Sequence, residues 1–211
     1  EPGGSNGGCC MAAAYKLGIS YISAASLAYS LACVVFIIAV SRLFRTKYPL
    51  YVSYLFLLFN PAAFSGEVLQ RVYRNSITPA QVLLIFGCFF GLYLRRRERL
   101  GKLLFWALGA GAAWASLEHS REDAVWVLPA ALMMTGISAA AVIKDAASSQ
   151  SGGRIKPGWR INARLGIFLL PVFIFWVSHP AIAAVNQIKY GVFCYNELND
   201  SHFADAMKAI Y

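Results

Sequence analysis

Six apolar stretches alternate with short polar segments along this chain. An α-helix needs about 20 mainly apolar residues to cross the hydrocarbon core of a bilayer. The stretches predict transmembrane helices at residues 19–40, 48–64, 79–94, 103–117, 124–143 and 165–185. The third and fourth are the shortest, so we expect them to gain turns from their flanks or to lie where the bilayer is thin. The pattern predicts an all-α, polytopic membrane protein.

Prolines and caps mark several of the predicted boundaries. Asn60-Pro61 interrupts the far end of the second span, because proline removes a backbone donor. Thr78-Pro79 opens the third span, with Thr78 as the N-cap and Pro79 at the first helical position. Between the fifth and sixth spans, residues 144–164 are rich in glycine, serine and basic residues, and we expect a linker there.

The segment between the second and third spans has two different sides. On a helical wheel, Glu67, Gln70, Arg71 and Arg74 fall on one side, and apolar residues fill the other. A helix of this kind is suited to the membrane interface. The sequence therefore predicts an amphipathic interfacial helix near residues 64–75.

Composition agrees with a membrane protein. Of the 211 residues, 58% are apolar and 14% are charged, whereas soluble domains carry about 25% charged residues. The net charge of +9 would suggest nucleic-acid binding in a soluble protein, but here the location of the charges matters more, and we expect no nucleic-acid partner. The five cysteines show no CxxC pair and no metal-ligand spacing with the histidines.

The charges predict how the chain is oriented. Most of the basic residues lie in the segments that follow the first, third and fifth spans, and most of the acidic residues lie in the alternate segments. Basic loops stay on the cytoplasmic side. The amphipathic helix, the segment 118–123 and the C-terminal segment 186–211 should then be extracytoplasmic.

Both ends of the chain suggest a piece of a longer protein. Residues 1–14 have a flexible, glycine-rich composition ahead of the helical transmembrane domain predicted for residues 15–185. The chain begins at Glu1 without a methionine, and it ends soon after a new helical pattern has begun. We therefore expect a fragment.

The second polar loop, residues 118–123, has two interpretations. Ser120 can cap the fifth span, and Asp123 can complete a capping box. Glu122 and Asp123 also favour a helix N-terminus electrostatically, whereas Glu118 and Arg121 have no such simple structural role. The amphipathic helix has a plain interpretation too, because Glu67 and Arg71 can pair on the helix surface and interfacial arginines extend towards the headgroups.

Carboxylates beside arginines also suit group transfer from a phosphate leaving group. A carboxylate can deprotonate an acceptor hydroxyl, and guanidinium groups can stabilise charge that develops on the phosphate. Two outer loops could bring such groups together. The predicted catalytic residues are Glu67 and Glu122, and the predicted substrate-binding residues are Arg71, Arg74, Arg121, Glu118 and His119. The sequence shows no nucleotide loop, zinc motif or nucleophile motif.

Three stretches carry a resemblance to a known family: FNPAAFSGEVLQRVYRNSITP, the Ser120–Asp123 segment leading into Trp126 and Pro129, and Lys189–Phe193 followed by Glu197 and Phe203. Here the chain resembles polytopic membrane glycosyltransferases of the C-type superfamily, or uncharacterised bacterial membrane proteins related to them. The resemblance implies a polyprenyl-phosphate-linked sugar as donor and an extracytoplasmic active face in the bacterial inner membrane. It implies hexosyl or pentosyl transfer to an extracytoplasmic acceptor.

The same resemblance assigns roles to individual residues. It makes Arg71 and Arg74 contacts of the donor phosphate, and it places Arg121 and Glu122 along the same cavity. It also implies an acidic residue in a first outer loop between two early spans, and that loop is either not in this sequence or lies before residue 1. No cofactor follows, and a divalent metal is left open.

Two other functions fit a chain of this kind. A transporter or flippase of lipid-linked sugars would need polar residues at mid-membrane depth. The predicted spans hold almost none, and their charges lie at the ends. A non-catalytic membrane scaffold would not depend on the outer arginines.

Overall fold

The computed structural model describes residues 18, 20–60, 76–121, 124–151, 158–191 and 193. All regular structure in these ranges is helical, as the apolar pattern predicts. The predicted interfacial helix near 64–75, the N-terminal segment 1–14 and most of the segment 186–211 lie outside the described residues.

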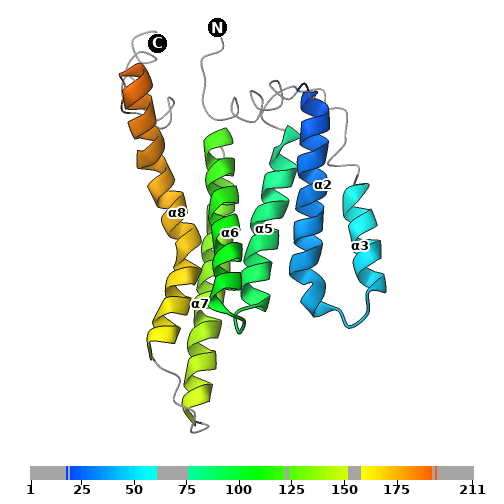
Figure 1. The fold of residues 1–211 in the computed structure, drawn as a ribbon, viewed down its shortest axis with the longest axis vertical. Helices are drawn as coiled ribbons and strands as arrows, with labels where there is room; N and C mark the ends of the chain where they lie inside the picture. Colours follow the sequence, from blue (N-terminus) through cyan, green and yellow to red (C-terminus); the bar gives the residue numbers. More distant parts are fainter. Residues whose placement is uncertain are drawn as a thin grey trace.

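The described helices run alternately up and down, side by side (Figure 1). Two 3-10 turns, at Ser41–Leu43 and Ala124–Val127, adjoin them. The α-helices are α2 (Tyr21–Val40), α3 (Tyr48–Leu58), α5 (Thr78–Leu94), α6 (Leu100–Ser120), α7 (Leu128–Ser151) and α8 (Gly158–Tyr190).

Four segments within this array are long and apolar enough to cross a membrane, by length and composition: Ile22–Leu43, Leu100–Ser120, Ala124–Ser148 and Ile161–Lys189. The protein is therefore membrane-integral. The other two predicted spans are shorter helices, α3 with 11 residues and α5 with 17. An 11-residue helix is about 16 Å long, roughly half the hydrocarbon thickness, so α3 by itself does not cross.

Several predicted boundaries were wrong because polar residues continue the helices. The expected linker at 144–164 is mostly helix, since α7 extends to Ser151 and α8 begins at Gly158. Glu118, His119 and Ser120, expected in a loop, form the last turn of α6. Polarity in these places marks where the apolar stretch ends, and the helix continues beyond it.

The C-terminal end of α8 has a recognisable stop. The helix runs past the predicted domain end at residue 185 as far as Tyr190. Gly191 follows with φ 75°, and its N–H donates to the Gln187 carbonyl. A left-handed glycine directly after a helix is a common C-terminal cap, because glycine adopts positive φ without a Cβ penalty.

The N-terminal caps agree in part with the sequence prediction. The Ser20 hydroxyl caps α2 by accepting a hydrogen bond from the Ser23 N–H. Pro79 lies in the first turn of α5, as predicted. Thr78 is already helical, and the N-cap position belongs to Ile77, which has no capping side chain.

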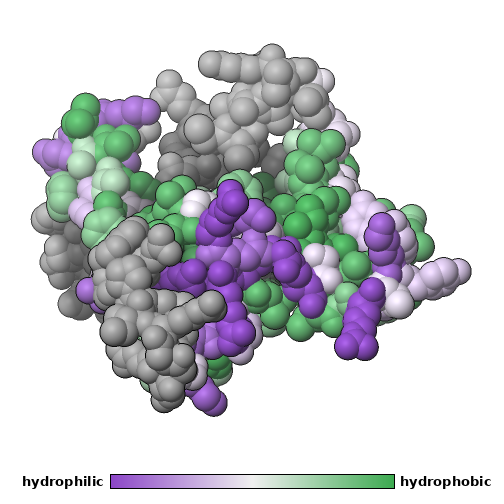
Figure 2. Space-filling model, turned by 60° about the horizontal axis from the view of Figure 1, so that its bottom comes forward, coloured by the Kyte–Doolittle hydropathy of each residue, from purple (hydrophilic) through white to green (hydrophobic). Residues whose placement is uncertain are grey.

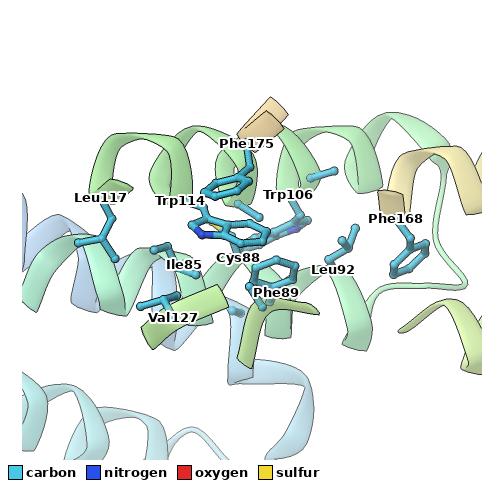
Figure 3. Close-up of a cluster of buried hydrophobic side chains, with 14 of the residues drawn as sticks. Ile85, Cys88, Phe89, Leu92, Trp106, Trp114, Leu117, Val127, Phe168 and Phe175 are labelled. Atoms are coloured by element: carbon cyan, nitrogen blue, oxygen red, sulfur yellow. The ribbon is translucent and has the colours of Figure 1, made fainter. Parts of the chain in front are cut away.

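The core is built where α5, α6 and α8 meet. Trp114 of α6 is buried, stacks on Phe175 of α8 with ring centroids 4.3 Å apart, and meets Phe89 of α5 edge-on. Figure 3 shows Phe175 lying over the Trp114 ring. Gly91 lets α5 approach α6, because a Cβ there would lie 2.4 Å from the Trp106 ring. Small residues commonly allow such close contacts between membrane helices.

The α3 helix lies at the edge of the array (Figure 1). It packs against α2 and has no buried residue. The Tyr29 hydroxyl of α2 donates to the Leu57 carbonyl of α3 at 2.7 Å. This bond adds a side-chain donor to a carbonyl in the last turn of α3 that also accepts from the Asn60 N–H at 3.3 Å.

Candidate functional site

The loops that follow α2 and α5 lie at one end of the array, together with the adjoining ends of α7 and α8 (Figure 1). We call this the basic end. Figure 2 turns this end forward and shows hydrophilic side chains gathered between hydrophobic ones. The predicted grouping of the basic segments on one side is therefore observed in the described residues.

Arg95 joins α5 to α2 at the basic end. Its buried guanidinium donates to the carbonyls of Ile38 at 2.6 Å and Ala39 at 3.0 Å, and it lies 4.8 Å from the centre of the Trp106 ring. The last carbonyls of a helix have no intrahelical donor, and a cation is favourable there. Burial lowers the pKa of Arg95, and the nearby Arg42 adds to this effect.

Arg164 makes the same kind of contact one helix further on. Its guanidinium, on α8, donates to the carbonyls of Arg96, Arg97 and Glu98 at 3.0–3.4 Å. These carbonyls belong to the turn after α5. Arg95 thus caps the C-terminal end of α2, and Arg164 attaches α8 to the turn between α5 and α6.

Two carboxylates complete the network. Asp145 of α7 accepts from Arg96 at 3.0 Å and from Arg97 at 2.7 Å. Glu98 pairs with Arg42 and with Lys102, the latter at 3.0 Å. The hydrogen bond from Lys102 holds the pKa of Glu98 below its usual range, and the charge of Arg42 adds to this.

The opposite end of the array is held by neutral hydrogen bonds. The Gln81 amide of α5 donates to the hydroxyls of Ser116 at 2.9 Å and Ser120 at 3.0 Å on α6. The Ser120 hydroxyl also donates to the backbone carbonyl of Ser116 at 2.7 Å, within α6. The prediction that Ser120 caps the fifth span was wrong, because its hydroxyl is used within α6 and against α5.

Two histidines meet at this end. His119 of α6 and His179 of α8 lie edge to face, with ring centroids 5.4 Å apart. His119 Nε2 lies 2.8 Å from the Ser178 hydroxyl, which donates to the Phe175 carbonyl. Because that hydroxyl has one hydrogen, it accepts from His119, so Nε2 of His119 carries a proton. His179 Nδ1 lies 2.9 Å from the same carbonyl and must be the donor.

Glu118 stands beside the histidines. It is half-buried in the last turn of α6 and interacts electrostatically with His179. An acid and two imidazoles can accept, hold and return a proton. We call Glu118, His119, Ser178 and His179 the His–Glu cluster.

The structure brings some of the predicted site residues together. Glu118 and His119 are in the cluster, and Arg121 follows directly at the end of α6. Glu67, Arg71, Arg74 and Glu122 lie outside the described residues. The predicted catalytic pair is therefore untested.

Sequence reasoning missed Ser178, His179 and Gln81. His179 had a signal that could have found it, since an ionisable residue within an apolar span is costly and usually has a function. Gln81 lacked one, because a single amide near a helix start is common.

A metal at this end finds no support in the described part of the chain, where no group of three or more His, Cys, Asp or Glu side chains could hold an ion. No protein-family model, curated protein or solved structure matches the chain.

Proposed function

We propose that this chain is an integral membrane glycosyltransferase that acts on a polyprenyl-phosphate-linked sugar at the end opposite the basic end. The observation that supports it best is the His–Glu cluster, which α6 and α8 build from three ionisable side chains in an otherwise apolar bundle. Ionisable groups in membrane helices are costly to keep, so their presence favours a function over a purely structural role.

The cluster supplies the proton chemistry that glycosyl transfer needs. Glu118 takes the proton of an acceptor hydroxyl as its oxygen bonds to the anomeric carbon of the sugar. The bond between that carbon and the phosphate oxygen breaks, and polyprenyl phosphate leaves with the electron pair. The neighbouring imidazoles of His119 and His179 can then take up the proton from Glu118. Arg121 lies one helical turn beyond Leu117, at the same helix end, where a phosphate can approach.

The part of the cluster that α6 supplies lies at a helix end and favours transfer over transport, whereas Ser178 and His179 lie within the apolar segment Ile161–Lys189 of α8. Glu118 and His119 are in the last turn of α6, and Gln81 is in the first turn of α5. A transporter would place such groups near the middle of the bilayer. The apolar outer faces of the long helices give a polyprenyl chain a surface to follow.

Glu118→Gln tests the proton acceptor. We expect it to reduce transfer of radiolabelled sugar from a polyprenyl-phosphate hexose or pentose to envelope acceptors by about a hundredfold or more, the usual contribution of a general base. Retention of tritiated polyprenyl phosphate by the purified variant should stay within twofold of the wild type. Glu98→Gln is the matched control, since it makes the same change at the basic end. Unchanged transfer by Glu118→Gln would remove the proposed mechanism. If the wild type retains polyprenyl phosphate but transfers no sugar, a flippase would be favoured instead.

The outer arginines are tested by binding rather than by rate. The double variant Arg71→Ala with Arg74→Ala should lose retention of polyprenyl phosphate, because a guanidinium pair matches the phosphate oxygens. Arg121→Ala should weaken retention by a smaller factor. If the double variant holds the lipid phosphate as tightly as the wild type, these arginines do not bind the donor.

A further inference from the structure

The connection between α2 and α3 combines basic and apolar side chains on one exposed segment. Leu43, Phe44 and Tyr48 are 60%, 40% and 82% exposed. The same segment contains three exposed basic residues, Arg42, Arg45 and Lys47. Aromatic and basic residues together at the end of an apolar helix are typical of the membrane–water interface.

An ion pair attaches this connection to the turn between α5 and α6. Arg42 pairs with Glu98, which also holds Lys102. Glu98 is therefore already shared by two cations. Arg99, the next residue in the turn, is exposed.

The basic end has more cations than its own acids can neutralise. In the described ranges, Asp145 and Glu98 are its acids, and both are engaged. No described acid lies within 4 Å of the cationic groups of Arg45, Lys47 or Arg99. Fixed anions that meet an exposed basic segment with apolar neighbours at a bilayer surface are the phosphates of lipid headgroups.

We propose that the α2–α3 connection and Arg99 form a docking site for the headgroups of anionic phospholipids. Leu43, Phe44 and Tyr48 enter the region of the acyl chains, and Arg45, Lys47 and Arg99 contact phosphates. Each basic residue near an anionic membrane surface favours binding by about fivefold. The site lies at the other end of the array from the His–Glu cluster, so the two proposals fail independently.

The test is lipid binding by the full chain in neutral detergent micelles, followed by native mass spectrometry. Phosphatidylglycerol and phosphatidylcholine of the same acyl chains are titrated in parallel. We expect the wild type to prefer phosphatidylglycerol by tenfold or more. The triple variant Arg45→Gln, Lys47→Gln, Arg99→Gln should bind it on the order of a hundredfold more weakly, and Arg45→Gln alone about fivefold more weakly.

Two controls remove one charge elsewhere. Lys189→Gln lies at the opposite end, and Lys144→Gln lies at the basic end on α7. Both should keep the wild-type affinity. A loss in Lys144→Gln equal to that in Arg45→Gln would assign the preference to the field of the whole end and overturn the site. Equal binding of the two lipids by the wild type, or full binding by the triple variant, would overturn it as well.

Two further arms separate lipid from free anion and guard against misfolding. Inorganic phosphate at 10-fold excess over lipid should displace little phosphatidylglycerol, since it lacks the acyl chains; complete displacement would indicate a site for a soluble anion. Raising the salt concentration should weaken the preference of the unmodified wild type, because salt screens exposed charges beyond about 10 Å at 0.1 M. If the preference of the wild type for phosphatidylglycerol does not change with salt, this result contradicts the proposal, and it does not depend on the folding of any variant.

Discussion

The two ends of the bundle are held together by different chemistry. At the basic end, Arg95 and Arg164 donate to backbone carbonyls of neighbouring elements, and Asp145 holds two further arginines. At the opposite end, an amide and two serine hydroxyls join α5 to α6 without a formal charge. The ionisable groups there, Glu118, His119 and His179, form a separate cluster between α6 and α8.

Helix direction alone does not explain this difference, because α2, α5 and α7 end at the basic end while α3, α6 and α8 end at the opposite one (Figure 1). Negative dipole poles and unpaired carbonyls therefore occur at both ends. The difference lies in the side chains that meet them, and at the basic end the Arg95 guanidinium brings both donors and a positive charge to the end of α2. The basic residues that set the predicted orientation of the chain thus also hold the helices together. At the opposite end, α6 satisfies its own last turn through Ser120.

Arg95→Met gives the largest effect we expect. It removes the donors to the Ile38 and Ala39 carbonyls and the contact with Trp106, and hydrogen bonds to charged groups contribute about 1.5–3 kcal/mol each. We expect a loss of about 3 kcal/mol in the free energy of unfolding, measured by denaturation in mixed micelles and followed by far-ultraviolet circular dichroism.

Arg97→Met is the control for Arg95. Its side chain is 74% exposed and pairs with Asp145, so its loss should cost much less than the loss of Arg95, because water screens exposed pairs. If the two variants are equally destabilised, the basic end depends on its overall charge and the carbonyl contacts of Arg95 have no special weight.

Gln81→Leu probes the neutral end and should cost less, about 1 kcal/mol. Ser120 keeps its bonds to the carbonyls of Ser116 and Leu117, so the substitution leaves that hydroxyl satisfied. The cost should be the same at 0.05 and 0.5 M salt, because no formal charge is involved. A penalty that shrinks as salt is added would show that Gln81 acts through charged groups after all.

The helices could be predicted from the sequence better than their ends. The apolar pattern located α2 to within two residues, because Ser20 caps it and Arg42 follows it. It misplaced the ends of α6, α7 and α8, where charged and hydroxyl residues continue the helix. Asp145 and Arg164, taken as linker residues, are helical, and each contacts the turn after α5.

The candidate site was predicted in part. Glu118, His119 and Arg121 could be found because they stand together between two apolar stretches. Ser178 and His179 could not be joined to them, since they are 59 and 60 residues away from His119 and local spacing carries no information on which helices are neighbours. The proximity of α6 and α8 depends on the packing of Trp114 on Phe175 and of Ile174 on Gly111.

Glu98→Gln should give the smallest effect, and its dependence on pH identifies the cause. The pKa of Glu98 is lowered in the folded protein by Lys102 and Arg42. A carboxylate with a lowered pKa stabilises the folded state above its unfolded pKa of about 4.3, and that stabilisation is lost as the pH falls through the folded value. At pH 7 we expect the free energy of unfolding of the wild type to exceed that of the variant by the few tenths of a kcal/mol to about 1 kcal/mol that is typical of exposed pairs. The difference should shrink below pH 4.3 and vanish once Glu98 is protonated. Asp145 titrates in both proteins, so its contribution cancels in the comparison.

A difference in stability that persists or grows in acid would mean that Glu98 supports the turn by packing. The ion pairs at the exposed rim of the basic end would then contribute little beside the carbonyl contacts of Arg95 and Arg164.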